Sequence, residues 1–376
     1  MLKILFVNWR DLSNPAGGGA ERFTEEIGRR LVDYGNQVTI FTSSFDHSEP
    51  ETIRHGIRII RHGGKYTVYF RARNYVKKHS SEYDIIVDEI NTVPFRIRKI
   101  VKSKPVVAVI HQLAREIWFY ETRFPANVLG YYMFEPFWLK EYRPVHTITV
   151  SDSTRDQLLA LGFEQVDVVH NGISMAPVKN TNGKEDHPVL IFLGRLVRSK
   201  LPDHAIAAFR LVKDTFPESE LWILGDGYLR KELESQAPEG VKFFGRVDEH
   251  MKAILLQKAH VLMFPSVREG WGLSVMEANS VGTPAVGYDI PGLRDSIQYE
   301  KTGLLTEPMN IQGLASGALR ILNDRRLAQN LSHNAVQWST NFNWDAAAKS
   351  FGNILDENVR RFEEQGFDQG SKQTNC

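Results

Sequence analysis

The chain has 376 residues, a length that favours two domains over one. Its 42% hydrophobic and 24% charged residues are typical of a globular protein, and its net charge of +1 gives no general attraction to nucleic acid. The single cysteine, Cys376, excludes a disulfide framework and a metal site built from cysteine pairs.

The sequence predicts no membrane span. A span needs about 20 mostly apolar residues, and the longest stretch free of Asp, Glu, Lys and Arg, residues 327–344, consists mostly of Asn, Gln, Ser, Thr and His. Residues 1–7 are apolar apart from Lys3 but few, and Arg10 and Asp11 follow, so we interpret them as a strand rather than a signal peptide. We therefore expect a cytoplasmic protein, with the inner membrane face as a peripheral location.

Short apolar runs alternate with helical patterns through the first half of the chain. The runs are contiguous and rich in Val and Ile, as in strands of a parallel sheet that helices cover on both faces. They lie at residues 4–7, 38–41, 57–60, 85–87, 106–110, 147–150 and 166–169. Residues 20–34 have a helical apolar period, with Gly35 as the C-terminal cap. Strands that alternate with helices predict an α/β fold.

A polar stretch over residues 176–188, without an apolar period, is typical of a linker. The alternation then resumes, with helical stretches at 202–214 and 248–258. The strand candidates of this second half are residues 189–193, 221–224, 241–244, 261–264 and 284–286. The sequence thus predicts one α/β domain over 1–175 and a second over 189–345. The polar residues 365–376 are predicted to be a disordered tail.

Charge and aromatic residues are unevenly distributed. Residues 54–104 hold 13 Lys and Arg against four Asp and Glu, and residues 118–142 hold 10 of the 40 aromatic residues. A solvated surface and a packed subdomain would explain these two features. The functional alternative is an anionic, partly apolar partner, such as a lipid-linked acceptor at a membrane surface.

The most informative stretch is residues 266–278, which follows the strand candidate 261–264. Gly270 and Gly272 allow a tight turn, and a helical pattern begins near Leu273. The start of a helix presents unpaired backbone N–H groups, which suit a phosphate or a sugar hydroxyl.

Two carboxylates, Glu269 and Glu277, lie eight residues apart in this stretch. As hydrogen-bond acceptors they suit the vicinal hydroxyls of a ribose or a hexose. The structural alternative is that the helix dipole favours Glu269 and that Glu277 is solvated.

Cations and glycines follow other strand candidates. Arg195 can grip phosphate oxygens bidentately and Lys200 can add a point charge, although a solvated basic loop is the alternative. Gly225 lies in a turn that can approach a flat ligand closely. Both loops follow the carboxyl ends of strands, where ligands bind in open α/β sheets.

The first half of the chain has two further candidates. The loop Gly17-Gly18-Gly19 opens the first helix but has the spacing of neither a dinucleotide fingerprint nor a Walker loop. It can hold an anion or a sugar, or be a flexible turn. His111 directly follows a strand candidate, in a structural or a functional role.

No His-Glu-x-x-His, Asp-x-Asp or cysteine-pair signature of a metal site occurs in the sequence. We therefore expect no metal and no other cofactor, with positive charge supplied by Arg195, Lys200 and helix dipoles.

Together, these motifs resemble the retaining glycosyltransferase family 4, which has the GT-B fold. The resemblance covers nearly the whole chain, from Leu2 to about Phe362. The matching residues are Gly17-Gly18-Gly19 with Glu21, His111, residues 169–173, Gly194-Arg195 with Lys200, Gly225-Asp226-Gly227, Gly245-Arg246-Val247, and the E-x7-E motif Glu269 to Glu277.

The resemblance implies two Rossmann-like domains that face each other across a cleft, the first binding an acceptor and the second a nucleotide-diphosphate sugar. It also implies that a helix over residues 346–364 crosses back to the first domain. Two residues depart from the family pattern. Gln112 stands where the family often has Asp, which leaves a carboxylate at the acceptor side in doubt, and Leu201 stands where it often has Gly.

The resemblance also implies residue roles. Arg195 and Lys200 would bind the diphosphate, Glu277 the ribose, and Glu269 the donor sugar, with His111 near that sugar. The other implied substrate contacts are Gly18, Gly19, Gly225, Arg246, Val247, Gly270, Trp271, Gly272 and Leu273. Transfer would retain the anomeric configuration, and the leaving phosphate would take the acceptor proton on the same face.

We therefore expect a hexosyltransferase that uses a UDP-, GDP- or ADP-sugar and a lipid-linked or polysaccharide acceptor, with an anionic membrane surface as a further partner. A soluble enzyme that makes a small glycoside or a sugar-phosphate disaccharide is the alternative within this class. A non-catalytic nucleotide-sugar binder is the alternative outside it. The missing dinucleotide fingerprint argues against an NAD-dependent oxidoreductase.

Overall fold

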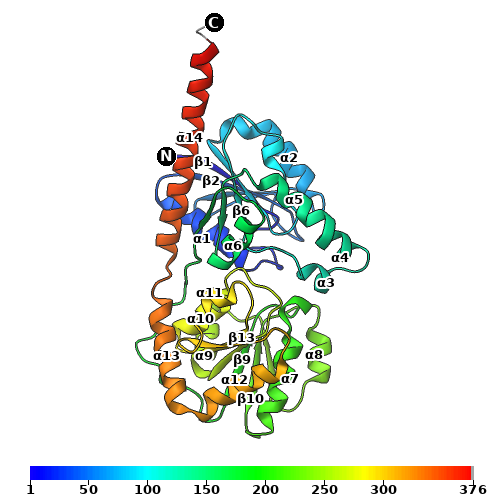
Figure 1. Cartoon of the computed structure of the whole chain (residues 1–376), viewed down its shortest axis with the longest axis vertical. Coiled ribbons are helices and arrows are strands. Elements are labelled where there is room, and N and C mark those ends of the chain that lie inside the picture. The colour runs from blue at the N-terminus through cyan, green and yellow to red at the C-terminus, as the bar shows by residue number, and fades with distance from the viewer. Residues whose placement is uncertain (374–376) are drawn as a thin grey trace. The chain divides into compact units, whose positions relative to one another are not determined.

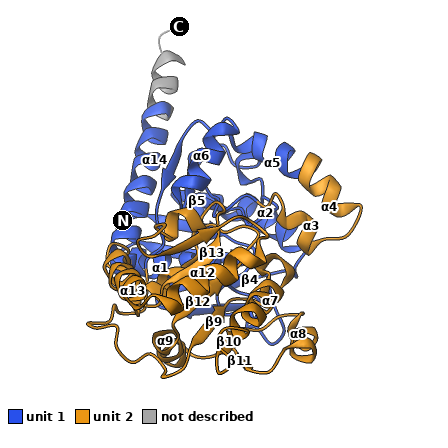
Figure 2. Cartoon of the chain, turned by 60° about the horizontal axis from the view of Figure 1, so that its bottom comes forward, with its two compact units in different colours: residues 1–113, 134–172, 344–376 blue, residues 114–133, 173–343 orange. Residues whose placement is uncertain are grey.

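The computed structural model describes residues 1–373, with side chains as far as Gln365. The described chain forms two compact α/β units (Figures 1 and 2). Unit 1 comprises Met1–Leu113, Phe134–Gly172 and the chain from Trp344 onward, and unit 2 comprises Ala114–Met133 and Ile173–Asn343.

Unit 1 contains an eight-stranded sheet of order β3-β4-β2-β1-β5-β6-β7-β8. All paired strands are parallel except β3 and β4. The strands are β1 (Lys3–Val7), β2 (Gln37–Thr42), β3 (Glu51–Arg54), β4 (Ile57–Arg61), β5 (Ile85–Glu89), β6 (Val106–Val109), β7 (Thr147–Thr149) and β8 (Val166–Val168). Every residue of β5 and β6 is buried, and both strands contain contiguous Val or Ile residues, as expected for central parallel strands.

In the described part of unit 1, five helices and two short 3-10 turns accompany the sheet. They are α1 (Gly19–Asp33), α2 (Val68–His79), η1 (Ser80–Glu82), η2 (Ile97–Lys99), α5 (Glu135–Tyr142), α6 (Asp152–Ala160) and α14 (Trp344–Gln373). Helices α1 and α14 lie side by side (Figure 1). Phe351 of α14 stacks on Phe6 of β1 at 5.8 Å between ring centroids and meets Phe23 of α1 edge-on at 5.9 Å.

Unit 2 contains a six-stranded parallel sheet of order β11-β10-β9-β12-β13-β14. Its strands are β9 (Val189–Leu193), β10 (Glu220–Leu224), β11 (Val241–Gly245), β12 (Val261–Phe264), β13 (Ala285–Tyr288) and β14 (Gly303–Thr306). Its helices and the turn η4 are α3 (Ile117–Glu121), α4 (Ala126–Leu129), η4 (Arg198–Lys200), α7 (Pro202–Lys213), α8 (Arg230–Gln236), α9 (Glu249–Lys258), α10 (Leu273–Ser280), α11 (Leu293–Ser296), α12 (Ile311–Asn323) and α13 (Arg325–Ser339).

Residues 114–133 lie in the first half of the sequence but belong to unit 2. Glu121 accepts hydrogen bonds from the Ser199 N–H at 2.8 Å and from the Tyr228 hydroxyl at 2.9 Å. Glu116 forms an ion pair with Arg268 at 3.0 Å. These polar contacts join α3 and its first flanking residue to the loops that follow β9, β10 and β12.

The predicted linker is fastened to unit 2. The Val178 N–H donates to the Ser280 carbonyl at 2.9 Å. Lys184 donates to the Ala259 carbonyl and to the Thr283 hydroxyl, both at 2.7 Å. Burial lowers the pKa of Lys184 to about 7. The polar composition of this stretch therefore reflects hydrogen bonds to the unit as well as solvation.

The C-terminal helix differs from the prediction. Helix α14 begins at Trp344 and continues to Gln373, so residues 365–373 of the predicted tail extend the helix. Each further residue of a formed helix adds a hydrogen bond, whereas only the first turn is costly. The remainder of the predicted tail, 374–376, lies outside the described residues.

Two strands were missed. β3 has only four residues, alternates in burial and pairs antiparallel at the edge of its sheet, so it lacks the contiguous apolar run of a central strand. β14 begins at Gly303, also at an edge. Within residues 1–373, no helix is both long and apolar enough to cross a membrane.

Candidate active site

The predicted donor-site residues gather at the carboxyl edge of the unit 2 sheet. Because its strands are parallel, the loops that follow them emerge at the same edge. Residues 194–200 follow β9, residues 225–227 follow β10, residues 246–247 follow β11, and residues 265–272 follow β12. The structure therefore brings the predicted cations and carboxylates of unit 2 to one edge.

Lys200 and Glu269 form a direct ion pair. The Lys200 Nζ donates a short hydrogen bond to the Glu269 Oε1, and the two side chains are 19% and 10% exposed. The Ser199 carbonyl accepts from the Val267 N–H at 3.0 Å, which joins the two loops through the backbone as well. A charge-assisted bond between two mostly buried groups fixes both side chains. Glu269 is thus positioned by a cation rather than by the helix dipole alone.

Arg195 presents a different environment. Its side chain is exposed, and its guanidinium has no ion pair within the described part of the chain. The loop therefore carries two positive charges, of which Arg195 is unpaired among the described residues and Lys200 is paired with Glu269. This combination can bind an anion with two phosphates, because the guanidinium is bidentate and the ammonium is a point charge.

Gly272 sets the start of α10. Its φ of 84° lies in the left-handed region that glycine adopts without strain. The helix has no side-chain cap, so its first backbone N–H groups are open to an acceptor such as a phosphate oxygen. Gly270 lies in the same loop, and Leu273 is the first helical residue.

The side chain of Trp271 is structural. It is 2% exposed and packs edge-on against Phe342 with ring centroids 4.9 Å apart. Only the backbone of Trp271 can therefore face a ligand, in keeping with the role that the family resemblance implies for it.

Glu277 is not solvated. Its carboxylate accepts a hydrogen bond from Lys252 of α9 at 2.7 Å, and the two side chains are 12% and 10% exposed. Sequence reasoning missed Lys252, which lies 25 residues before its partner. The only available signal was a lysine on the inward face of a helix. The ion pair orients the Glu277 carboxylate.

Gly225 is required by the packing of two loops. A Cβ at this position would lie 1.9 Å from the Gly194 carbonyl oxygen, and its φ is 134°. Gly227 is similarly confined, because a Cβ there would lie 2.2 Å from the Leu196 carbonyl oxygen. These glycines therefore shape the edge of the site by close backbone contact, whether or not they also touch a ligand.

Arg246 and Val247 follow β11 on the same edge. Arg246 is exposed and Val247 is half-buried against the apolar core of unit 2. Their position at the end of the sheet is compatible with a contact to a nucleobase, the role that the resemblance implies.

The glycine loop of unit 1 is held by Glu21. The Glu21 carboxylate accepts a hydrogen bond from the Gly18 N–H at 2.7 Å and forms an ion pair with Arg10 at 3.1 Å. A Cβ on Gly18 would meet only Glu21, at 3.8 Å, so packing within unit 1 leaves space there. Gly19 is the first residue of α1, and an anion is favoured at such a position.

His111 follows β6 at the carboxyl edge of the unit 1 sheet. Its ring packs edge-on against Phe23 at 5.1 Å between centroids. Its Nε2 is buried and has no hydrogen-bond partner within the described residues. Burial lowers the pKa of His111 to about 4, so the ring is neutral at pH 7. A neutral imidazole with an unsatisfied nitrogen is suited to a hydrogen bond with a sugar hydroxyl.

Sequence reasoning missed Glu89, the last residue of β5. Its carboxyl group is 1% exposed and hydrogen bonds with Asn8 and with Thr24. Asn91 in turn donates to the Asn8 Oδ1 at 3.1 Å. Burial raises the pKa of Glu89 to about 8. The available signal was a carboxyl group directly at the end of an apolar strand.

Among the described residues, no group of three or more His, Cys, Asp or Glu side chains is placed to hold a metal ion. Arg195, Lys200 and the start of α10 contribute positive charge at the unit 2 edge.

Two family models together cover most of the chain. The model for glycosyl transferases group 1 matches residues 177–338, and the model for glycosyltransferase family 4 matches residues 17–176. The chain belongs to the glycosyltransferases of group 1 and family 4. The family predicted from the motifs is therefore confirmed.

Curated relatives of this glycosyltransferase agree with the assignment. An uncharacterised glycosyltransferase of Methanocaldococcus jannaschii is 26% identical over 94% of this chain and 97% of its own length. Glycogen synthase of Mycobacterium tuberculosis is 31% identical over 55% of this chain. That match spans about half of the synthase, 53% of its length.

Solved structures confirm the predicted GT-B class of fold. Sucrose-phosphate synthase of Thermosynechococcus elongatus has a TM-score of 0.77 at 20% identity, over 95% of this chain and 99% of that one. WaaG, a glycosyltransferase of lipopolysaccharide biosynthesis, has a TM-score of 0.74 at 17% identity, over 94% of this chain and 99% of that one. HepE of Anabaena, solved in a complex with UDP and glucose, has a TM-score of 0.73 at 17% identity, over 95% of this chain and 100% of that one.

Proposed function

We propose that this glycosyltransferase moves a hexose from a nucleotide-diphosphate sugar to an acceptor hydroxyl, with retention of the anomeric configuration. The observation that carries the proposal is the buried Lys200–Glu269 pair next to the uncapped start of α10. A cation, a carboxylate and open backbone N–H groups at one sheet edge are suited to a diphosphate joined to a hydroxyl-rich sugar.

In this proposal Arg195 and Lys200 bind the diphosphate and stabilise the negative charge that develops as it leaves. Glu277, oriented by Lys252, accepts hydrogen bonds from the ribose hydroxyls. Glu269 and the backbone of residues 270–273 hold the donor sugar. Arg246 and Val247 lie next to the base, and Gly225 shapes the edge between them.

In the same proposal, residues of unit 1 also contact the donor. Gly18 and Gly19 approach the phosphate, and neutral His111 hydrogen bonds with the donor sugar. As the bond from the anomeric carbon to the diphosphate breaks, a diphosphate oxygen takes the proton of the acceptor hydroxyl. The acceptor oxygen then bonds to the anomeric carbon on the same face.

We further propose that Arg195 and Lys200 supply the positive charge at the diphosphate without a divalent metal. The acceptor in this proposal is a lipid-linked or polysaccharide glycan, which places the protein at the cytoplasmic membrane face. The exposed aromatic residues of 118–142 support this acceptor class. A soluble enzyme that makes a small glycoside is the second candidate, and a nucleotide-sugar binder without activity is the third.

The decisive experiment is a thermal-shift panel of UDP, GDP, ADP and their glucose conjugates, each with EDTA and with added Mg²⁺. A ligand that binds the folded state raises its melting temperature. We expect one nucleotide series to raise the melting temperature equally in EDTA and in Mg²⁺. UDP is the first probe because HepE was solved with UDP and with UDP-glucose.

Lys200→Ala should lose the shift, whereas Lys301→Ala, a change of an exposed lysine elsewhere in unit 2, should keep it. No shift with any nucleotide would contradict the proposed donor site. A shift that requires Mg²⁺ would contradict metal independence alone.

A further inference from the structure

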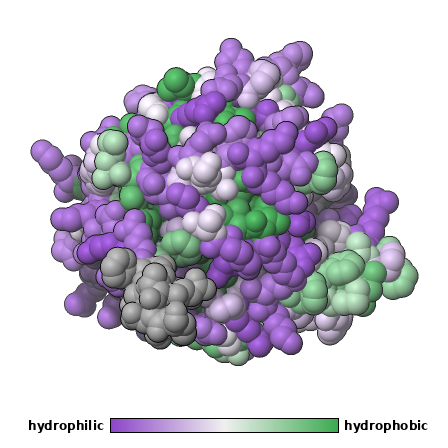
Figure 3. Space-filling view, turned by 90° about the horizontal axis from the view of Figure 1, so that it is seen from above, coloured by the Kyte–Doolittle hydropathy of each residue, from purple (hydrophilic) through white to green (hydrophobic). Residues whose placement is uncertain are grey.

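Aromatic side chains are exposed on α5 and on the chain that leads into it. In unit 1, Phe134 is 37% exposed and Phe137 is 56% exposed. Within residues 114–133, which belong to unit 2, six further large apolar side chains are exposed, namely Phe119, Phe124, Val128, Leu129, Tyr132 and Met133. Figure 3 shows apolar surface, in green, at the side where Figure 1 places α4. Exposed apolar patches on this scale mark interaction sites.

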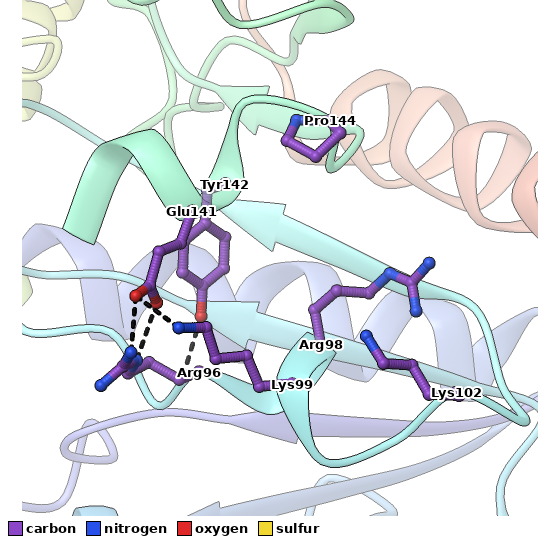
Figure 4. A pocket seen from close by; sticks show the side chains of 7 residues that line it. All are labelled: Arg96, Arg98, Lys99, Lys102, Glu141, Tyr142 and Pro144. Carbon is purple, nitrogen blue, oxygen red and sulfur yellow. Dashed lines mark hydrogen bonds and ion pairs between the residues drawn. The ribbon is translucent and has the colours of Figure 1, made fainter. Parts of the chain in front are cut away.

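A basic pocket of about 290 Å³ lies in unit 1, at the C-terminal end of α5 (Figure 4). Four of its seven lining residues are cations, and one is a carboxylate. The residues are Arg96, Arg98, Lys99, Lys102, Glu141, Tyr142 and Pro144.

The backbone that carries the cations is anchored to the core. The Arg96 N–H donates to the Tyr142 hydroxyl at 2.8 Å, and this hydroxyl donates to the fully buried Asp88 at 2.6 Å. Asp88 also accepts from the Ile97 N–H at 3.1 Å. The position of η2 is thus fixed before any ligand arrives, which lowers the entropy cost of binding.

The single carboxylate balances only part of the positive charge. Glu141 accepts hydrogen bonds from Arg96 and Lys99. Although burial alone would raise its pKa, these hydrogen bonds hold the pKa of Glu141 below its ordinary value. Within residues 1–373, Arg98 and Lys102 form no ion pair, and Figure 4 shows both of their charged groups apart from Glu141. Two positive charges of the pocket therefore remain available for an anion.

The basic and aromatic features are adjacent. The Arg96 guanidinium lies 5.9 Å from the centroid of the Phe137 ring. Because Arg96 lines the pocket, the pocket lies next to a side chain suited to the apolar part of a bilayer interface.

We propose that this pocket binds the phosphate headgroup of an anionic membrane lipid while the exposed side chains of Phe134 and Phe137 enter the interface. Charge complementarity favours an anionic bilayer over a neutral one, and the aromatic residues favour a bilayer over a soluble anion. The proposal deepens the proposed function, on which it rests for the presence of a membrane-borne acceptor, by naming the surface that meets the membrane.

The test is co-sedimentation of the full chain with phosphatidylcholine vesicles, with and without phosphatidylglycerol. The wild type should bind the anionic vesicles and not the neutral ones. The double variant Arg98→Ser/Lys102→Ser should bind the anionic vesicles about tenfold more weakly or worse. Phe137→Ser should weaken binding several-fold while the pocket cations remain.

The matched control is Lys231→Ser/Lys301→Ser, which removes the same charge from exposed positions of unit 2. This control should bind like the wild type. Equal losses in the two double variants would overturn the pocket and leave only a net-charge effect. Equal binding of the wild type to neutral and anionic vesicles, or to neither, would overturn the proposal outright.

Two further measurements keep the outcomes separate. Every variant should keep its nucleotide-induced thermal shift, so failure at the membrane is distinguishable from failure of the donor site. A thermal shift with inorganic phosphate in the wild type, lost in Arg98→Ser/Lys102→Ser and unaccompanied by vesicle binding, would overturn the lipid in favour of a soluble phosphate.

Discussion

We expect the substitution of Lys200 to reduce activity more than that of any other single residue. Replacing it with Ala removes a charge from the leaving diphosphate and leaves Glu269 buried without its cation. Losing one preorganised stabiliser of developing charge typically costs about 100-fold or more in turnover. We expect a loss of that size in Lys200→Ala, measured as the rate of nucleotide release from donor and acceptor.

The double variant Lys200→Ala/Glu269→Gln separates catalysis from stability, because it leaves no unpaired buried carboxylate. Its melting temperature should recover towards that of the wild type while its turnover stays low. Near-normal turnover in Lys200→Ala would contradict the donor-site assignment.

The raised pKa of Glu89 predicts that the stability of the protein depends on pH. Its pKa is about 8 in the folded chain, above the ordinary value of 4.5, so the folded state holds a proton that the unfolded state loses as the pH rises. The free energy of unfolding should therefore fall between about pH 4.5 and pH 8, by up to about 1.4 kcal/mol per pH unit. Glu89→Gln should remove this slope, measured as urea unfolding of both proteins at pH 5 to 8. Parallel curves for the two proteins would contradict the assignment.

Individual side chains could be predicted where a motif marked them. The E-x7-E spacing and the Gly-Arg loop identified Glu269, Glu277 and Arg195 as candidates. Lys252 could not be predicted in this way, because its meeting with Glu277 depends on how α9 and α10 pack. The short-range pattern of a sequence carries no record of such a contact.

At the level of elements, the turn after β10 is the most constrained. Gly225→Ala would place a Cβ 1.9 Å from the Gly194 carbonyl oxygen, in a backbone conformation that L residues rarely adopt. We expect a loss of about 2 kcal/mol or more in unfolding free energy, together with weaker nucleotide binding. The measurement is the melting temperature with and without nucleotide.

Gly64→Ala is the matched control, since a Cβ there meets nothing within 4 Å. It should leave the melting temperature almost unchanged. A Gly225→Ala variant as stable as Gly64→Ala would show that the two loops can separate freely.

Most strands were predictable because central parallel strands are contiguous apolar runs. The edge strands β3 and β14 were not, since an edge strand needs no such run. The contacts of the linker could not be predicted either. Lys184 has the composition of a loop residue, yet its Nζ donates two hydrogen bonds to the body of unit 2.

At the scale of the whole chain, two α/β units could be predicted from the restart of the strand pattern after residue 188. The path between them could not. The division falls between residues 113 and 114, 133 and 134, 172 and 173, and 343 and 344. The placement of α3 depends on Glu116 and Glu121, whose partners lie far along the sequence in unit 2.

This path limits how the protein can be recombined. The two family models meet between residues 176 and 177, which is the obvious point at which to join the halves of two relatives in order to exchange donor specificity. A hybrid joined only there would inherit α3 from one parent and the Ser199 and Arg268 loops from the other. Hybrids that take residues 114–133 from the same parent as the second half should keep these contacts intact. Exchange of the second half between relatives therefore requires that this segment is exchanged with it.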